Sequence, residues 1–346
     1  MKYTTLPTTD IKVSKIGLGT MTWGQQNTES EGHEQLDYAF GQGINFIDTA
    51  ELYSVPGRKE TNGSTERIIG TWLQKTGKRD QIILATKVAG PNAGLTYIRE
   101  NLGFSKEAVT EALHKSLTRL QTDYIDLYQL HWPERKANFF GKLGYEHDPN
   151  DAWEDNINEV LHTLSGFVRE GKIRHIGLSN ETPWGTMRFL EEAKNNPELP
   201  RVLTVQNPYS LLNRSYEVGL AEVSMRSKVG LLAYSPLAFG VLSGKYIMGN
   251  PENGRVNLFP QLSRYNNIQS RVATAKYFEL AQKHGLRLAQ MALAYINIQP
   301  FLTSNIIGAT TMVQLKENIG SIDVELSEEV LKGIQEIHLQ HPNPAP

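Results

Sequence analysis

The chain of 346 residues contains no cysteine. This absence excludes disulfide bonds, thiolate zinc sites and a cysteine nucleophile. No stretch approaches the length of about 18 consecutive apolar residues that a membrane-spanning helix needs. The first residues, MKYTTLPTTD, also lack the apolar run of a signal peptide. We therefore expect a cytoplasmic protein with no membrane partner.

Strong positive charge is missing as well. Lysine and arginine total 35 residues against 37 acidic ones, which gives a formal net charge of −2. Nucleic-acid binders and anionic-membrane binders need a basic face, so no nucleic-acid partner is expected. The hydrophobic fraction of 39% and the charged fraction of 21% are those of a soluble globular protein with a substantial core.

Motifs of several other enzyme classes are absent. There is no P-loop and no H-E-x-x-H. The nine histidines do not cluster with carboxylates at a metal-ligand spacing, so we expect no metal site. The stretch GLSNE (177–181) lacks the last glycine of G-x-S-x-G, which argues against a serine hydrolase.

What the sequence does contain is a steady alternation of short β-rich runs and amphipathic stretches. The eight strand candidates are residues 16–20, 45–50, 81–88, 124–131, 173–180, 202–207, 230–237 and 304–310. Apolar residues at three- and four-residue spacing predict helices such as 105–121 and 151–172. Most of the strands are apolar on both faces, which is typical of a parallel sheet covered by helices.

Eight such units predict a single α/β domain over residues 1–346, a (β/α)8 TIM barrel preceded by a β-hairpin in YTTLPTTDIKVS. Three long connections, 89–104, 132–150 and 238–268, each follow a strand and would lie at the C-terminal mouth, where such barrels build active sites. The alternative is an open doubly wound sheet, which needs a glycine-rich phosphate turn after its first strand. In GLGTMTWG (17–24) the third glycine comes two positions too late for that turn, so we favour the barrel.

Four polar residues follow three consecutive strands of the predicted barrel. Asp48 ends one strand and leads to Tyr53 in FIDTAELY, Lys87 ends the next in ATKV, and His131 ends the third in QLHW. Each residue alone has an ordinary explanation: Asp48 as a cap, Lys87 as a lysine reaching for solvent, His131 as a core histidine. Because the ends of parallel strands meet at one mouth, all four would share a pocket.

These four side chains suit proton donation to a carbonyl oxygen. Tyrosine is a weak acid with an ordinary pKa of about 10. A lysine ammonium within hydrogen-bond reach would stabilise the phenolate and make Tyr53 a better acid near neutrality. Asp48 would keep Lys87 charged and oriented, and His131 would hydrogen-bond the substrate oxygen. The set lacks an electron source, so a hydride donor is implied.

The chain resembles the aldo-keto reductase family over nearly its whole length. The motifs that carry the resemblance occur in order: GLGTMTWG, FIDTAELY, ATKV, LYQLHWP, IGLSN, VQNPYSLL, LLAYSPL and IIGATTMVQLKEN. It is similar in particular to the bacterial Tas-type branch, which also resembles the β subunits of voltage-gated potassium channels. The resemblance implies a (β/α)8 barrel, reduction of aldehydes and ketones to alcohols, and Asp48, Tyr53, Lys87 and His131 as the catalytic tetrad.

The resemblance also implies NADP(H), bound extended without a Rossmann motif. The residues that match the nicotinamide carboxamide site are Ser179, Asn180 and Gln206. Tyr234 matches the aromatic residue that stacks on the nicotinamide ring. The pyrophosphate loop that follows contains Ser235, Leu237 and Ala238. The residues that match the adenosine end are Gly308, Thr310, Gln314, Glu317 and Asn318. The remaining cofactor candidates are Thr20, Met21, Asp48, Lys245 and Arg255.

Two positions depart from the family pattern. Many family members carry a lysine and an arginine, which contact the 2′-phosphate of NADP(H), where this chain has Gly308 and Gln314. A preference for NADP(H) must therefore rest on Lys245, Arg255 and Thr310. For the substrate pocket we expect walls from Trp23, Tyr53, His131 and Trp132 together with the connections 89–104 and 132–150.

Two other functions are compatible with parts of this pattern. A sensor or regulatory subunit loaded with NADP(H) and turning over slowly would use the same fold, because a fold does not settle a function. The intact tetrad favours an enzyme. A purely structural barrel would have to bury these charges without using them, which is costly. The physiological carbonyl substrate and the oligomeric state stay open.

Overall fold

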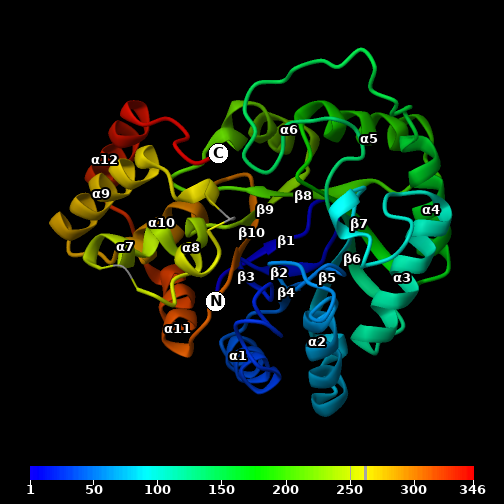
Figure 1. Ribbon diagram of the computed structural model, residues 1–346, viewed down its shortest axis with the longest axis horizontal. Helices are drawn as coiled ribbons and strands as arrows, with labels where there is room; N and C mark the ends of the chain where they lie inside the picture. Colours follow the sequence, from blue (N-terminus) through cyan, green and yellow to red (C-terminus); the bar gives the residue numbers. More distant parts are fainter. Residues whose placement is uncertain (250, 261–262) are drawn as a thin grey trace.

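The computed structural model describes residues 1–249, 251–260 and 263–346 (Figure 1). Eight parallel strands form a closed barrel in the order β10-β3-β4-β5-β6-β7-β8-β9, which confirms the predicted (β/α)8 architecture. The barrel strands are β3 Ile16–Gly19, β4 Phe46–Asp48, β5 Ile83–Val88, β6 Ile125–Leu130, β7 Ile173–Ser179, β8 Val202–Pro208, β9 Gly230–Tyr234 and β10 Leu302–Ile307.

The predicted N-terminal hairpin is also present. Strands β1 (Tyr3–Thr5) and β2 (Lys12–Ser14) pair in antiparallel fashion. Leu6 and Val13 of this hairpin are fully buried in one cluster with side chains of the barrel strands such as Phe46. Because the hairpin's apolar side chains pack into the barrel core, the open end that remains is the C-terminal mouth.

Helices surround the barrel, and α9 and α12 lie together on one side of it (Figure 1). The α-helices are α1 Glu29–Gly41, α2 Ser64–Thr76, α3 Lys106–Leu120, α4 Ile157–Arg169, α5 Pro183–Asn195, α6 Leu220–Ser227, α7 Lys245–Met248, α8 Arg255–Leu258, α9 Ile268–Lys283, α10 Leu288–Asn297, α11 Met312–Gly320 and α12 Glu328–Gln340. The 3-10 helices are η1 Arg79–Gln81, η2 Ala93–Leu95, η3 Ser215–Val218, η4 Ala238–Ser243, η5 Ser263–Tyr265 and η6 Ser321–Asp323. Among the residues described, no helix is both long and apolar enough to span a bilayer.

The predicted helix over 105–121 matches α3, which Ser105 caps by accepting a hydrogen bond from the backbone of Ala108. The predicted helix over 151–172 is wrong in its first turn and a half, because α4 begins only at Ile157. Asp151 and Asp155 each accept a hydrogen bond from the backbone N–H two residues later. Such local bonds compete with the helical pattern and delay its start.

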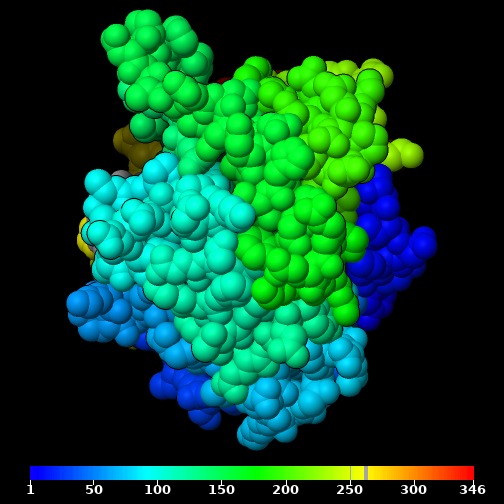
Figure 2. Space-filling model, turned by 90° about the vertical axis from the view of Figure 1, so that its right-hand side faces the viewer, coloured from blue at the N-terminus to red at the C-terminus, as the bar shows by residue number. Residues whose placement is uncertain are grey.

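Two of the three long connections contain some regular structure, and the one after β5 holds η2. The connection after β9, predicted as irregular over 238–268, holds η4, α7, α8 and η5, and residues 250, 261 and 262 of it lie outside the described residues. The connection after β6 runs from His131 to α4, and part of it projects from the surface in Figure 2. All three connections follow barrel strands at their C-terminal ends, so they surround the mouth.

Candidate active site

The parallel register brings Asp48 and Lys87 together. Asp48 is the last residue of β4, and Lys87 lies near the end of the neighbouring strand β5. The Lys87 Nζ donates hydrogen bonds of 2.7 Å to Asp48 Oδ2 and 2.7 Å to the Thr49 carbonyl oxygen, and both side chains are buried. Burial alone would lower the pKa of Lys87, but Asp48 and then Tyr53 outweigh it and raise that pKa. Lys87 is therefore a buried, oriented ammonium.

Tyr53 stands within hydrogen-bond reach of this ammonium, with 3.4 Å between Lys87 Nζ and the Tyr53 hydroxyl oxygen. A second buried ion pair fixes the segment that carries the tyrosine. The Glu51 carboxylate accepts hydrogen bonds of 2.7 Å from the Ala89 backbone and 2.8 Å from Arg99 Nη2. Glu51 in FIDTAELY thus ties the Tyr53 segment to the connection after β5.

His131 completes the group at the end of β6. Its backbone N–H donates to the Val88 carbonyl at 2.9 Å, and its ring centroid lies 5.7 Å from that of Tyr53. Burial, with a smaller effect of Lys87, holds the pKa of His131 well below its ordinary value. The imidazole is therefore neutral near pH 7 and offers one N–H donor.

The pKa of Tyr53 is set by two opposing influences, burial of the phenol and the nearby Lys87. Lys87 does lower the pKa of Tyr53, but burial of the phenol is the larger influence and the net pKa is raised. Lys87 thus acts in the predicted direction, but burial outweighs it and keeps the pKa of the phenol above its ordinary value. Tyr53 therefore stays protonated near neutral pH. Lys87 makes the rise in its pKa smaller than burial alone would cause.

The second oxygen of Asp48 is held by amides. Gln206 Nε2 donates to Asp48 Oδ1 at 2.8 Å, and Gln129 Nε2 donates to the same atom at 3.2 Å. Gln129 was not among the predicted site residues. The available signal was its place near the end of the strand, two residues before His131; the parallel register sets it opposite Lys87. Each oxygen of the buried carboxylate thus has a donor, which fixes its orientation.

Asn180 connects the predicted carboxamide site to the histidine. Its Nδ2 donates to the His131 carbonyl oxygen at 2.8 Å, and its Oδ1 accepts from the Tyr234 hydroxyl at 2.6 Å. Ser179 Oγ donates to the Gln206 carbonyl oxygen at 3.0 Å. Asn180 has a positive φ of 54°, a conformation that asparagine tolerates better than most residues. The side chains predicted to hold the nicotinamide therefore form one connected network.

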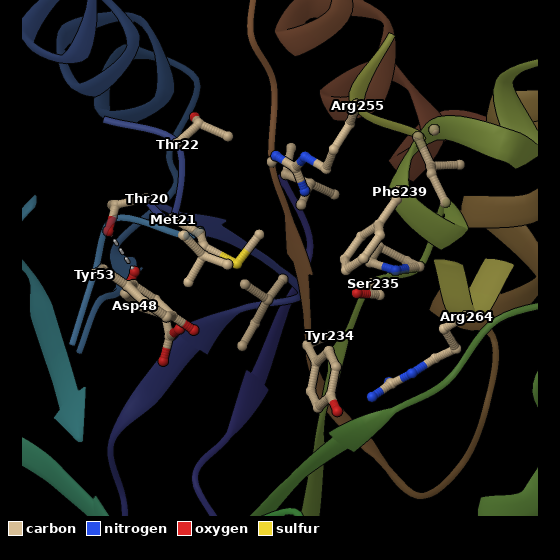
Figure 3. Close-up of a pocket in the computed structure, with 18 of the residues that line it drawn as sticks. Thr20, Met21, Thr22, Asp48, Tyr53, Tyr234, Ser235, Phe239, Arg255 and Arg264 are labelled. Carbon is tan, nitrogen blue, oxygen red and sulfur yellow. Dashed lines mark hydrogen bonds between the residues drawn. The ribbon is translucent and has the colours of Figure 1, made fainter. Parts of the chain in front are cut away.

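A cavity of about 1000 Å³ opens at the barrel mouth beside this network. The predicted site residues that line it are Thr20, Met21, Asp48, Tyr53, His131, Trp132, Ser179, Asn180, Gln206, Tyr234, Ser235, Leu237, Lys245, Arg255, Gly308, Thr310, Gln314, Glu317 and Asn318. Figure 3 shows Asp48 and Tyr53 on one side of the cavity and Ser235 and Phe239 on the other. Lys87 is fully buried and does not line the cavity, but it contacts two side chains that do, Asp48 and Tyr53.

Besides Lys87, two predicted site residues do not line the cavity. Trp23 is fully buried in the main hydrophobic core, and its indole Nε1 donates to Gln35 Oε1 of α1 at 3.2 Å. The turn after β3 directs this tryptophan toward the helices, so its assignment to the substrate pocket is wrong. Ala238 is fully buried in the cluster beneath the connection after β9 and does not line the cavity either.

The far end of the cavity carries cations without acidic partners. Among the residues described, neither Lys245 nor Arg255 forms an ion pair with a carboxylate, and the Arg255 guanidinium lies 5.3 Å from the Phe239 ring centroid. Burial lowers the pKa of Arg255 to about 10. Burial and the neighbouring Arg255 also lower the pKa of Lys245. The positive charges at this end of the cavity could therefore pair with an anionic ligand.

The predicted adenosine end lies at the N-terminus of α11. Gln314 Oε1 accepts hydrogen bonds from the Thr310 backbone at 3.0 Å and from Thr310 Oγ1 at 3.1 Å. Asn318 Nδ2 donates to the Gly308 carbonyl oxygen at 3.2 Å. No lysine or arginine is contributed by these positions, so the positive charge of the cavity comes from the connection after β9.

Several lining residues were missed from the sequence. The most informative are Phe140, Phe239 and Arg264, all on the long connections. Periodicity in a strand or helix tells which face a side chain occupies, but these connections have no such period. Nothing in the spacing of their sequence indicated that these three side chains face the cavity.

Comparisons with known proteins agree with this architecture. The model of the aldo/keto reductase family matches residues 15–339. Protein tas of Escherichia coli (strain K12) is 51% identical over 353 aligned positions, covering 100% of both chains. An oxidoreductase of Bacillus subtilis, YrpG, is 33% identical and covers 97% of this chain and 96% of its own. An aldo-keto reductase of Babesia bovis is 38% identical over 69% of this chain. The chain belongs to the aldo/keto reductase family of oxidoreductases.

Proposed function

We propose that the protein reduces aldehydes and ketones to alcohols with NADPH as the hydride donor and Tyr53 as the general acid. The observation that carries this proposal is the position of the Tyr53 hydroxyl, 3.4 Å from a buried lysine ammonium that is itself 2.7 Å from Asp48. The His131 ring lies beside the Tyr53 ring, with 5.7 Å between the two ring centroids. Their side chains converge on one cavity.

The cavity suits a dinucleotide in size and charge. Its volume of about 1000 Å³ lies at the upper end of ordinary ligand pockets. Lys245 and Arg255, without carboxylate partners among the described residues, would hold the phosphates of the cofactor, and Tyr234 would stack on its nicotinamide. When bound there, the reduced cofactor supplies a hydride to the carbonyl carbon.

The protein's own side chains would donate the proton and stabilise the charge that its transfer leaves behind. The substrate oxygen would accept hydrogen bonds from the Tyr53 hydroxyl and from the neutral ring of His131. As negative charge develops on that oxygen, Tyr53 transfers its proton, and Lys87 stabilises the phenolate that remains. Asp48 keeps Lys87 charged throughout. The raised pKa of Tyr53 ensures that the donor carries its proton when a substrate arrives.

The direct test is to follow NADPH oxidation by purified protein with a panel of aldehydes and ketones. The proposal expects many turnovers per protein molecule with at least one of these compounds, and saturation with respect to the carbonyl. A single turnover per molecule with every compound would contradict it and favour the slow NADP(H)-loaded sensor or regulatory subunit.

A further inference from the structure

A third unpaired cation lines the cavity. Arg264, in η5, is half-buried, and no carboxylate among the described residues forms an ion pair with it. Its guanidinium lies 5.7 Å from the ring centroid of Phe140 and 5.7 Å from that of Tyr265. Taking an arginine partly out of water without an anion costs free energy. Cation–π contacts return only part of that cost, so an anionic ligand would complete the site.

Arg264 is separated from the phosphate end. Figure 3 shows its guanidinium beside the hydroxyl end of Tyr234, whereas Arg255 lies at the opposite end of the drawn cavity, with Phe239 and Ser235 between them. The Tyr234 hydroxyl hydrogen-bonds Asn180 at 2.6 Å, and Asn180 in turn hydrogen-bonds the His131 carbonyl. Arg264 therefore belongs to the part of the cavity near the tetrad.

Aromatic contacts connect His131 to Arg264 along the other side. The His131 and Trp132 ring centroids are 5.0 Å apart, and those of Trp132 and Phe140 are 6.0 Å apart. Phe140 then contacts the Arg264 guanidinium. The wall that starts at the proposed oxygen-binding histidine thus runs over two aromatic rings and ends at one fixed positive charge.

Gly141 packs closely against the Arg264 side chain. It has a positive φ of 95°, and a Cβ built on it would come within 3.2 Å of Arg264 Nε. The connection after β6 therefore lies directly against the arginine, and a side chain at Gly141 would have to displace it. Burial alone would lower the pKa of Arg264, but the phenol oxygens of Tyr265 and Tyr234 raise it, so the charge persists.

We propose that Arg264 selects substrates that carry a carboxylate or phosphate group remote from the reacting carbonyl. This inference rests on the proposed carbonyl reduction. The carbonyl oxygen would lie at Tyr53 and His131, an apolar or aromatic body would pack on Trp132 and Phe140, and the anion would pair with the guanidinium. The planar fork of arginine matches two oxygens of such a group.

Three probes of one shape test the proposal: 4-formylbenzoate, its neutral methyl ester, and 4-formylphenyl phosphate. For the wild type we expect kcat/KM for at least one anion to exceed that for the ester by about tenfold or more, the scale of one hydrogen bond to a charged group. Whichever anion shows the larger preference identifies the group. In Arg264→Met the preference should fall below about threefold, whereas Arg264→Lys should retain part of it because the charge remains.

A matched control is Arg271→Met, because Arg271 is an exposed arginine on α9 that donates to Asn266 Oδ1. This variant should keep the wild-type preference. Equal kcat/KM for anions and ester in the wild type would overturn the proposal for Arg264 while leaving the reductase intact. A uniform loss for all three probes in Arg264→Met would also overturn it, because that pattern indicates support of the loop alone.

Binding measurements separate this proposal from the reaction itself. Calorimetry with 4-(hydroxymethyl)benzoate and 4-(hydroxymethyl)phenyl phosphate, the alcohols from the two anionic probes, needs no turnover. We expect NADP⁺-loaded wild type to bind the preferred one about tenfold or more tightly than Arg264→Met does. If neither anion is reduced but this difference is found, the subsite stands and the proposed function fails. If instead NADPH binding weakens in Arg264→Met as much as in an Arg255 variant, Arg264 binds the cofactor and not the substrate. That result would overturn the proposal.

Discussion

The two walls of the cavity are built in opposite ways. On the strand side, the buried charges Asp48 and Lys87 are paired at 2.7 Å, and the carboxylate also accepts two amide hydrogen bonds. On the side of the connection after β9, Arg255 and Arg264 have no carboxylate partner among the described residues.

The difference indicates that the two walls have different roles, one in proton transfer and one in ligand binding. The strand wall is complete before any ligand arrives, as preorganised proton transfer requires. The loop wall has unpaired positive charges, which the proposed anionic ligands would neutralise. Substitutions in the strand wall should therefore change the rate of the chemical step, whereas substitutions in the loop wall should change affinity and selectivity.

The largest effect is expected for Tyr53→Phe. This change removes the proton donor and keeps the ring, so kcat should fall by about 10²–10⁴-fold, the range for loss of general acid catalysis. NADPH affinity, measured by protein fluorescence, should stay within about twofold, because the hydroxyl contacts the substrate oxygen in the proposed site. Near-normal turnover would remove Tyr53 from its role.

Lys87→Met should come next in size. Without the ammonium, Tyr53 keeps its burial and loses the main influence that lowers its pKa, so the pKa rises further. Reduction should slow steeply. Because reduction needs protonated tyrosine and is lost as pH rises through that pKa, its basic limb should move to higher pH. Steady-state rates across a pH series measure both effects.

Asp48→Asn provides the comparison for the lysine variant. It should be milder, because Lys87 keeps its 2.7 Å hydrogen bond to the Thr49 carbonyl and stays charged. The amide nevertheless presents a donor either to Lys87 or to Gln206, so some loss of rate is expected. If Asp48→Asn proves slower than Lys87→Met, the roles assigned within the strand wall are in the wrong order.

In the loop wall, Arg255→Ala should weaken NADPH binding by about 1.5–3 kcal/mol, the scale of a hydrogen bond to a charged group. NADH lacks the 2′-phosphate, so its affinity should hardly change. The advantage of NADPH in the wild type should shrink as salt rises, because the arginine is half-buried and only partly shielded from ions. Equal losses for both cofactors would mean that Arg255 contacts the pyrophosphate instead.

The strand wall was the part that the sequence could predict. Asp48, Lys87 and His131 end strands of a parallel barrel, and the fold brings such ends to one mouth whatever the intervening segments do. The segment after β3 was the exception: Trp23 follows a strand in the same way, but its turn sends the ring into the core. Strand position predicts which end of the barrel a residue occupies, and the turn geometry decides where it points.

The loop wall could be predicted only where the family pattern named its residues. Lys245 and Arg255 were found through that resemblance, while Phe140 and Arg264 were missed. Their orientation depends on contacts between two connections far apart in the sequence, such as Gly141 against Arg264. No local sequence pattern predicts such a contact. Only the structure shows that the side chain of Arg264 faces the cavity.

The smallest effect is expected when a positive charge is added near the loop wall. Gly308, where many family members carry a lysine, is exposed, and a Cβ built on it would find its nearest neighbour, the Gly19 carbonyl oxygen, at 4.0 Å. Gly308→Lys should therefore be tolerated and should tighten NADPH binding by about 0.3–1 kcal/mol, the scale of an exposed ion pair, without changing NADH. Gly308→Ala adds the Cβ without charge and should leave both affinities within about twofold. A gain for NADH as large as that for NADPH would show that the lysine reaches the pyrophosphate, and no gain at all would place the 2′-phosphate away from α11.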